Sequence, residues 1–236
     1  MLALLTMAIA ARCDLVVISP GTATKSSVDT LRDSCIALAS ARSASGARVT
    51  LLLREPALDD GDVSALVREL VHHFTPRHLW LHEKCAGAAP TAAAHGLGLH
   101  LSSAADWRAM REEWEGPLGA SAHSHADVAR AQECALEWVF LSPVYQPSSK
   151  PLDTRAHLGE SYVLQAQEMH PQVAVYALGG ISLTSAASLA AAGLRGIAIL
   201  GGVFRASTAT TPMQAASAGA EYLCAVDHVR VDQETQ

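Results

Sequence analysis

Short apolar runs alternate with longer amphipathic stretches along almost the whole chain. The apolar runs are rich in Val, Leu and Ile and are too short for buried helices, which favours strands that are covered on both faces. They predict strands at Leu15–Ser19, Arg48–Arg54, His78–His82, Leu97–Leu101, Leu118–His123, Trp138–Val144, Val173–Leu178 and Gly196–Leu200.

The stretches between these runs carry apolar residues at helical spacing. They predict helices at Ser27–Ala41, Asp62–His73, Ala86–His95, Ala104–Trp114, Ala126–Ala135, Glu160–Met169, Leu183–Ala192 and Pro212–Cys224. Strands that alternate with helices run parallel and are joined by right-handed crossovers. Eight such units predict a single (β/α)8 TIM barrel, with a doubly wound open sheet as the alternative. The first strand is followed by Ser19–Thr24, which lacks the glycine spacing of a dinucleotide site.

The pattern assigns residues 15–228 to the barrel, residues 1–14 to an N-terminal extension and the polar residues 229–236 to a tail. Met1–Ala10 is apolar, but no positive charge precedes it and it is too short to span a bilayer. We therefore expect a segment that packs under the barrel, or a misplaced start codon, rather than a signal peptide.

Composition narrows the class of partner. Half of the 236 residues are hydrophobic and 17% are charged, as in a compact domain. The net charge of −6 and the lack of a Lys/Arg-rich run argue against nucleic acid, and we expect no membrane partner either. The five cysteines are scattered without CxxC spacing, which predicts free thiols and a cytoplasmic location. Assembly into a homo-oligomer stays open.

Two glycine pairs follow the seventh and eighth predicted strands, Gly179-Gly180 and Gly201-Gly202. In barrels of this kind, the loops after these two strands commonly bind phosphate. Glycine lets the backbone approach a phosphate closely, and the next helix adds its positive N-terminal end. Ser182 is placed to cap that helix. We therefore predict a phosphate site at these four glycines, although tight turns alone would also explain each pair.

Ser121 and His123 lie two residues apart at the end of the fifth predicted strand. Side chains alternate along a strand, so both should point the same way, towards the barrel mouth where catalytic groups sit. Histidine suits proton transfer because its unperturbed pKa is near 6.5. His123 is the predicted acid/base and Ser121 its catalytic neighbour. His123 and His125 lack an obvious third ligand, so we predict no metal.

Four further residues are predicted to bind substrate. Lys150 and Ser149 lie in a Pro/Ser-rich loop after the sixth strand and can bind an anionic group. Arg54 ends the second predicted strand and is predicted to bind an anionic group in the same way. His100 ends the fourth strand, where it is either a core histidine or a substrate contact.

Together these residues resemble the thiamine phosphate synthase/TenI family. The resemblance runs from about Leu15 to Phe204 in consistent order. The segments that carry it are Arg54-Glu55, His100-Leu101, Gly119–Ser124, Ser142–Lys150, Leu178–Ile181 and Ala191–Ile199.

Departures from the synthases separate the branches of that family. Synthases resemble one another in a Q-x-R-x-K pattern on the second strand, and at that place this chain has Leu52-Leu-Arg-Glu-Pro56. Their two magnesium-binding aspartates correspond to Glu83, next to His82, and to Ala105, with Asp106 one position away. Pro147 stands in place of a threonine in the loop before Lys150. One aligned carboxylate is a poor basis for a magnesium site that bridges a pyrophosphate.

The resemblance therefore implies a TenI-like thiazole tautomerase of thiamine biosynthesis. Such an enzyme aromatises a carboxythiazole phosphate by moving a proton around the ring, without a cofactor. One alternative is a divergent thiamine phosphate synthase that uses Glu83 and Asp106 to bind Mg²⁺ and joins an aminopyrimidine pyrophosphate to a thiazole phosphate. A second alternative is a non-catalytic barrel that binds thiamine precursors or regulates a partner.

Overall fold

The computed structural model describes residues 13–146, 156–204 and 210–227. The predicted tail 229–236 and all but the last two residues of the predicted N-terminal extension 1–14 lie outside the described residues. So do Ser149 and Lys150.

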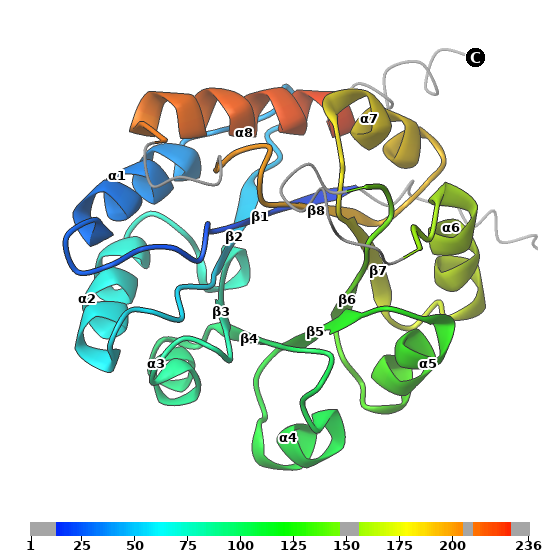
Figure 1. Ribbon diagram of the computed structural model, residues 1–236, viewed down its shortest axis with the longest axis horizontal. Helices are drawn as coiled ribbons and strands as arrows, with labels where there is room; N and C mark the ends of the chain where they lie inside the picture. The colour runs from blue at the N-terminus through cyan, green and yellow to red at the C-terminus, as the bar shows by residue number, and fades with distance from the viewer. Residues whose placement is uncertain (1–12, 147–155, 205–209, 228–236) are drawn as a thin grey trace, which may run out of the picture.

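Eight parallel strands close into a barrel in the order β1 to β8, and eight α-helices surround it (Figure 1). The predicted (β/α)8 fold is confirmed, and the open sheet is excluded because β1 pairs with both β2 and β8. The strands are β1 (Asp14–Ile18), β2 (Val49–Leu53), β3 (Leu79–His82), β4 (Gly98–Leu101), β5 (Leu118–Ala122), β6 (Trp138–Leu141), β7 (Ala174–Leu178) and β8 (Gly196–Ile199).

The helices follow the predicted pattern with small shifts at their ends. They are α1 (Val28–Ala39), α2 (Asp60–Leu70), α3 (Ala88–His95), α4 (Trp107–Glu113), α5 (His125–Glu133), α6 (Glu160–Met169), α7 (Leu183–Ala191) and α8 (Pro212–Asp227). A 3-10 turn at Pro76–His78, which the pattern did not predict, precedes β3. No helix in the described part of the chain is long and apolar enough to cross a membrane.

Alternating side chains build two separate cores. Those on one face of each strand, such as Leu51 and Leu81, pack outward against the helices. Those on the other face fill the barrel interior, where the rings of Trp80 and Trp138 lie 4.1 Å apart and Tyr176 joins them.

Glycines on the neighbouring strands make room for these three aromatic rings. A Cβ at Gly98, Gly119 or Gly196 would lie within 2.4 Å of the ring of Trp80, Trp138 or Tyr176 respectively. The aromatic rings fill the lower part of the barrel. The polar side chains His82, His100 and Ser121 lie above these rings, at the end where the strands reach their carboxyl ends.

Five strands end earlier than predicted at that end, β1, β2, β5 and β8 by one residue and β6 by three, and the changes at β5 and β6 affect the candidate site. β5 ends at Ala122 rather than His123, because the chain turns into α5 through the N-cap Ser124. β6 ends at Leu141 rather than Val144. Pro143 has no N–H to continue the ladder. Both changes place the last predicted strand residues in loops above the barrel mouth.

Candidate active site

The carboxyl ends of β2, β3, β4 and β5 gather five polar side chains at one side of the barrel mouth. The strand register pairs His82 with His100, and the Ser121–Phe140 pair places Ser121 on the same interior face as Phe140. Arg54 lies two residues beyond the Leu52–Trp80 pair, next to His82. His123 follows β5. The structure therefore brings together three of the predicted site residues, Arg54, His100 and Ser121, around His82, and places His123 in the loop directly after β5.

Hydrogen bonds hold both the backbone and the ring of His123. Its backbone N–H donates to Asp127 Oδ2 at 2.9 Å, and Ser124 caps the first turn of α5 beside it. Its Nδ1 lies 2.8 Å from the carbonyl oxygen of Ser142, at the end of β6. A carbonyl oxygen can only accept, so Nδ1 carries the proton. In the uncharged ring, Nε2 is then the basic nitrogen, and the side chain is exposed at the mouth.

Ser121 contacts His100 rather than His123. Its Oγ lies 3.1 Å from His100 Nε2, and the His100 ring stacks on Phe140 with centroids 4.3 Å apart. His100 has no exposed surface, whereas Ser121 is half-buried. Burial, reinforced by the nearby His82, holds the pKa of His100 well below its usual range. A molecule at the mouth would thus meet the hydroxyl of Ser121, with an uncharged imidazole behind it.

His82 belongs to the same group of side chains, although the sequence analysis did not select it. It is the last residue of β3 and lies with its ring 5.5 Å from that of His100. Burial, together with the positive charges of Arg54 and Lys84, lowers the pKa of His82 to about 4. The alternation that selected Ser121 and His123 could have found it, because Trp80 and His82 have the same spacing.

Arg54 and Glu55 have different roles at the end of β2. The guanidinium of Arg54 is half-buried and lies beneath Gly21, where an added Cβ would be 2.7 Å from Nη1. Glu55 is completely buried and accepts hydrogen bonds from the backbone N–H groups of Gly21 and Ala23, at 2.9 and 2.8 Å. Glu55 therefore anchors the loop after β1 over the arginine.

The two glycine pairs differ in their surroundings. Gly179 and Gly180 have φ values of +100° and +66°, and a Cβ on Gly180 would lie 2.6 Å from the carbonyl oxygen of Gln146. The turn after β7 thus packs tightly under the loop after β6. At Gly201 an added Cβ would meet nothing within 4 Å, whereas at Gly202 it would meet the Tyr222 hydroxyl at 2.5 Å. Of these four glycines, only Gly201 faces open space.

Ser182 caps α7 as predicted. Its Oγ accepts from the backbone N–H of Ser185, and Ser185 Oγ accepts from the backbone N–H of Ser182, which completes a capping box. The N-terminus of α7 is therefore well formed directly after the Gly179-Gly180 turn, in the position from which a helix end can bind an anion.

The two carboxylates of the magnesium alternative already have backbone partners. Glu83 Oε1 accepts from the N–H of Ser102 at 2.9 Å, and Asp106 Oδ1 accepts from the N–H of Ala109 at 3.1 Å as the N-cap of α4. Among the described residues, no group of three or more His, Cys, Asp or Glu side chains could hold a metal ion. This donor set does not fit a magnesium ion, which needs several oxygen ligands in octahedral array.

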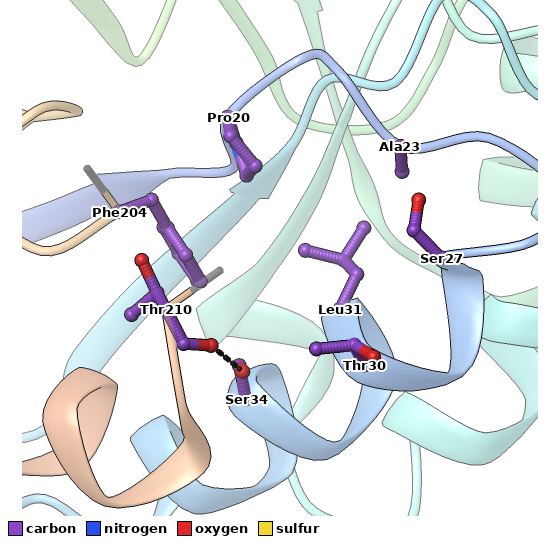
Figure 2. A pocket seen from close by; sticks show the side chains of 8 residues that line it. All are labelled: Pro20, Ala23, Ser27, Thr30, Leu31, Ser34, Phe204 and Thr210. Carbon is purple, nitrogen blue, oxygen red and sulfur yellow. Dashed lines mark hydrogen bonds between the residues drawn. The ribbon is translucent and has the colours of Figure 1, made fainter. Parts of the chain in front are cut away.

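A small cavity lies beside the mouth, between α1 and the segment after β8 (Figure 2). Its volume is only about 10 Å³, roughly the room that one water molecule needs. Ser34 Oγ donates to the carbonyl oxygen of Thr210 across its base, at 2.9 Å. Its lining residues are Pro20, Ala23, Ser27, Thr30, Leu31, Ser34, Phe204 and Thr210. None of the predicted site residues lines it, so we assign it no part in the chemistry.

Comparison with known proteins identifies the family. Residues 15–203 match the family model described as thiamine monophosphate synthase. The thiamine-phosphate synthase of Bacillus licheniformis is 31% identical over 104 residues, which cover 44% of this chain and 45% of that protein. The thiamine-phosphate synthase of Geobacillus kaustophilus is 29% identical over 117 residues, or 49% and 51% of the two chains. The matches span about half the length of these relatives.

Solved structures share the fold. Thiamine phosphate pyrophosphorylase from Pyrococcus furiosus is similar with a TM-score of 0.66 and 17% identity, over 94% of this chain and 98% of that one. A tryptophan synthase from M. tuberculosis is similar with a TM-score of 0.63 and 16% identity, over 92% and 93%. Because the latter carries a different name on the same barrel, the reaction has to be argued from the site residues.

Proposed function

We propose, from the premise that the chain belongs to the thiamine monophosphate synthase family, that it is a TenI-like thiazole tautomerase. Its substrate is a carboxythiazole phosphate, and its reaction moves one proton around the ring to make the ring aromatic. The observation that carries this proposal is the ring of His123, which is tied at Nδ1 to the Ser142 carbonyl and leaves Nε2 as the base at the mouth.

In the proposed reaction, Nε2 of His123 takes a proton from one position of the thiazole ring. The resulting imidazolium returns it at another position, so that the protein and substrate together neither gain nor lose a proton. The carbonyl of Ser142 accepts a hydrogen bond from Nδ1 in both states and keeps the ring in one orientation. The reaction needs no cofactor.

The remaining predicted residues hold the substrate in this proposal. Arg54 binds the carboxylate, and Ser121 donates its hydroxyl while His100 orients it from behind. The glycine turns after β7 and β8 bind the phosphate through backbone N–H groups, with the most room at Gly201. Lys150 and Ser149 stay predicted ligands of an anionic group.

The second candidate is a thiamine phosphate synthase, which the names of the relatives favour. That reaction ionises a pyrophosphate ester, and a cation normally neutralises the leaving group. Glu83 and Asp106 each have one oxygen occupied by a backbone N–H, and no group of three or more His, Cys, Asp or Glu side chains in the described residues could hold such a cation. For this reason the proposed reaction includes no magnesium-dependent step, and the synthase is the second candidate. A barrel that binds thiazole without turnover is the third candidate.

The test uses the purified full chain in two assays. Conversion of carboxythiazole phosphate, followed by NMR, should proceed equally with Mg²⁺ and with excess EDTA. Aminopyrimidine pyrophosphate and thiazole phosphate with excess Mg²⁺ should give no thiamine phosphate. Glu83→Ala and the control Glu112→Ala, which removes an exposed carboxylate from α4, should behave alike in the first assay.

Three other outcomes are possible. Magnesium-dependent synthesis that disappears in Glu83→Ala, but not in Glu112→Ala, would establish the synthase instead. Binding of the thiazole phosphate without either reaction would establish the non-catalytic barrel. Absence of both binding and turnover would reject a thiazole substrate altogether.

A further inference from the structure

We propose that His82 is a further substrate-binding residue, whose Nε2–H donates a hydrogen bond to the carboxylate of the thiazole that Arg54 also binds. This inference rests on the proposed function, because it assigns a ligand atom of that substrate. It makes His82 a determinant of the preference for a carboxylated thiazole.

The side chain of His82 faces the barrel interior. Its neighbour two residues back, Trp80, belongs to the interior aromatic group, and the register pairs His82 with His100. Leu79 and Leu81 alternate with them and pack outward against the helices. The ring therefore stands at the uppermost interior position of β3.

The backbone determines which ring nitrogen of His82 carries the proton. The N–H of Lys84 lies 3.1 Å from Nδ1, and a backbone N–H can only donate. Nδ1 must accept, so the ring proton is on Nε2. The turn that presents this N–H is held by two more hydrogen bonds, from Cys85 N to the His82 carbonyl and from Glu83 N to the His100 carbonyl, each at 2.9 Å. His82 is thus built as a donor.

That donor has no partner among the residues that the structure describes. Among the described residues, the side-chain nitrogen and oxygen atoms that are fully buried and have no hydrogen-bond partner are His100 Nδ1, Arg130 Nε, Trp138 Nε1 and Thr210 Oγ1. His82 Nε2 is not one of them, and the residue is 5% exposed where His100 is 0% exposed. The N–H is therefore unpaired but still reachable from the mouth. A nearly buried donor without a partner in the protein is unfavourable unless water or a ligand supplies the acceptor.

The position of His82 in the ring of strands selects the end of the substrate that it meets. In the closed order β1 to β8, β3 lies opposite β7, which leads into the Gly179-Gly180 turn (Figure 1). A phosphate held by the turns after β7 and β8 would leave the other end of the molecule on the opposite side of the mouth, towards β3 and β4. Arg54 lies next to His82 and makes that end of the site suitable for a second anion. The guanidinium of Arg54 and the Nε2–H of His82 then both donate to the same carboxylate.

The experiment compares two ligands on four proteins. Dissociation constants of carboxythiazole phosphate, and of the thiazole phosphate that lacks the carboxylate, are measured on the full chain by calorimetry. The proteins are the parent, His82→Phe, His82→Gln and His73→Phe, a control that makes the same change at an exposed histidine. His82→Phe keeps a ring next to His100 but has no donor, and His82→Gln restores an N–H near the position of Nε2.

We expect His82→Phe to weaken binding of the carboxylated ligand by about 10- to 100-fold, as for loss of one hydrogen bond to a charged group. Binding of the other ligand should change by less than about twofold, and His82→Gln should recover most of the loss, because only the donor has been removed and restored. Equal weakening of both ligands, or none, would overturn the inference.

A second measurement separates this inference from the proposed function. Nitrogen NMR of the histidine rings, assigned with His82→Phe, should show His82 protonated at Nε2 and bare at Nδ1. Protonation at Nδ1 would overturn the donor role whatever the ligand does. A parent protein that binds neither thiazole would instead reject the proposed function and with it the assigned carboxylate.

Discussion

The two sides of the barrel mouth are built in different ways. At the ends of β2 to β5, the site consists of side chains that hydrogen bonds hold in place. Backbone groups hold two of them, His123 through the Ser142 carbonyl and His82 through the N–H of Lys84, whereas Ser121 is held by the side chain of His100. At the ends of β7 and β8, the predicted phosphate site consists of backbone with four glycines, and an added Cβ would meet a neighbouring atom within 3.0 Å at all of them except Gly201.

In the proposed function, the difference corresponds to what each side has to do. Proton transfer depends on which ring nitrogen carries the proton, and a single hydrogen bond to a backbone group determines that. Binding of a phosphate depends on how closely N–H groups can approach it, which requires the absence of a Cβ. A substitution on the first side should therefore change proton transfer or recognition of the thiazole ring, and one on the second side should change stability or phosphate binding.

The largest expected effect concerns His123. His123→Gln removes the base but keeps a polar side chain, so kcat for the tautomerase should fall by roughly 10²–10⁴-fold while affinity for the phosphate is retained. The control is His125→Gln, because the ring of His125 packs on Tyr162 of α6 and its Nε2 lies 3.0 Å from the Tyr162 carbonyl oxygen. Steady-state kinetics on both variants are the measurement. Turnover of His123→Gln within a few-fold of the parent would remove His123 from the mechanism.

A smaller effect should appear in the pH dependence of stability. Unfolded His82 takes up a proton as the pH falls below about 6.5, whereas the folded residue does so only near the depressed pKa of about 4. Between these values the unfolded state binds more protons, so the free energy of unfolding falls as the pH falls, by about 3 kcal/mol from His82. Above pH 7 this group makes no contribution to the slope.

Urea unfolding of the parent and His82→Phe from pH 7 to 4.5 measures that contribution, because the other groups cancel in the difference. The variant should lose less stability on acidification. Parallel curves for the two proteins would show that His82 is not held uncharged by the fold.

The smallest expected effect compares the two glycine turns directly. Gly180→Ala should destabilise the protein by about 1–3 kcal/mol, because the residue is left-handed and its Cβ would meet the Gln146 carbonyl. Gly201→Ala should change stability by less than about 0.5 kcal/mol, since its Cβ would enter open space. Its effect should fall on phosphate affinity instead.

Urea unfolding and phosphate binding are measured on both variants of the pair. Equal destabilisation by the two substitutions would mean that both turns are structural, and the assignment of Gly201 to phosphate would lose its support.

The sequence predicted the position of a residue in the barrel wherever a pattern among nearby residues determines it. The period of two in the apolar runs predicted that Ser121 and His123 lie on the mouth side of β5. The same period should have selected His82, two residues after the interior Trp80, but a histidine at the end of an apolar run gives no sign of its partners. The sequence likewise gave no sign of the partner of Ser121, because that partner, His100, lies on the neighbouring strand β4.

The sequence by itself determined the eight alternating units, the glycine pairs after the last two strands and the family to which the chain belongs, because each depends on residues close together or in fixed order. Only the tertiary structure decided which nitrogen of each histidine is protonated, which glycine turn is packed and which is open, and that Glu83 and Asp106 already have backbone partners. These properties depend on contacts between neighbouring strands and the loops above them. Closure of the barrel creates those contacts, and no local pattern in the chain encodes them.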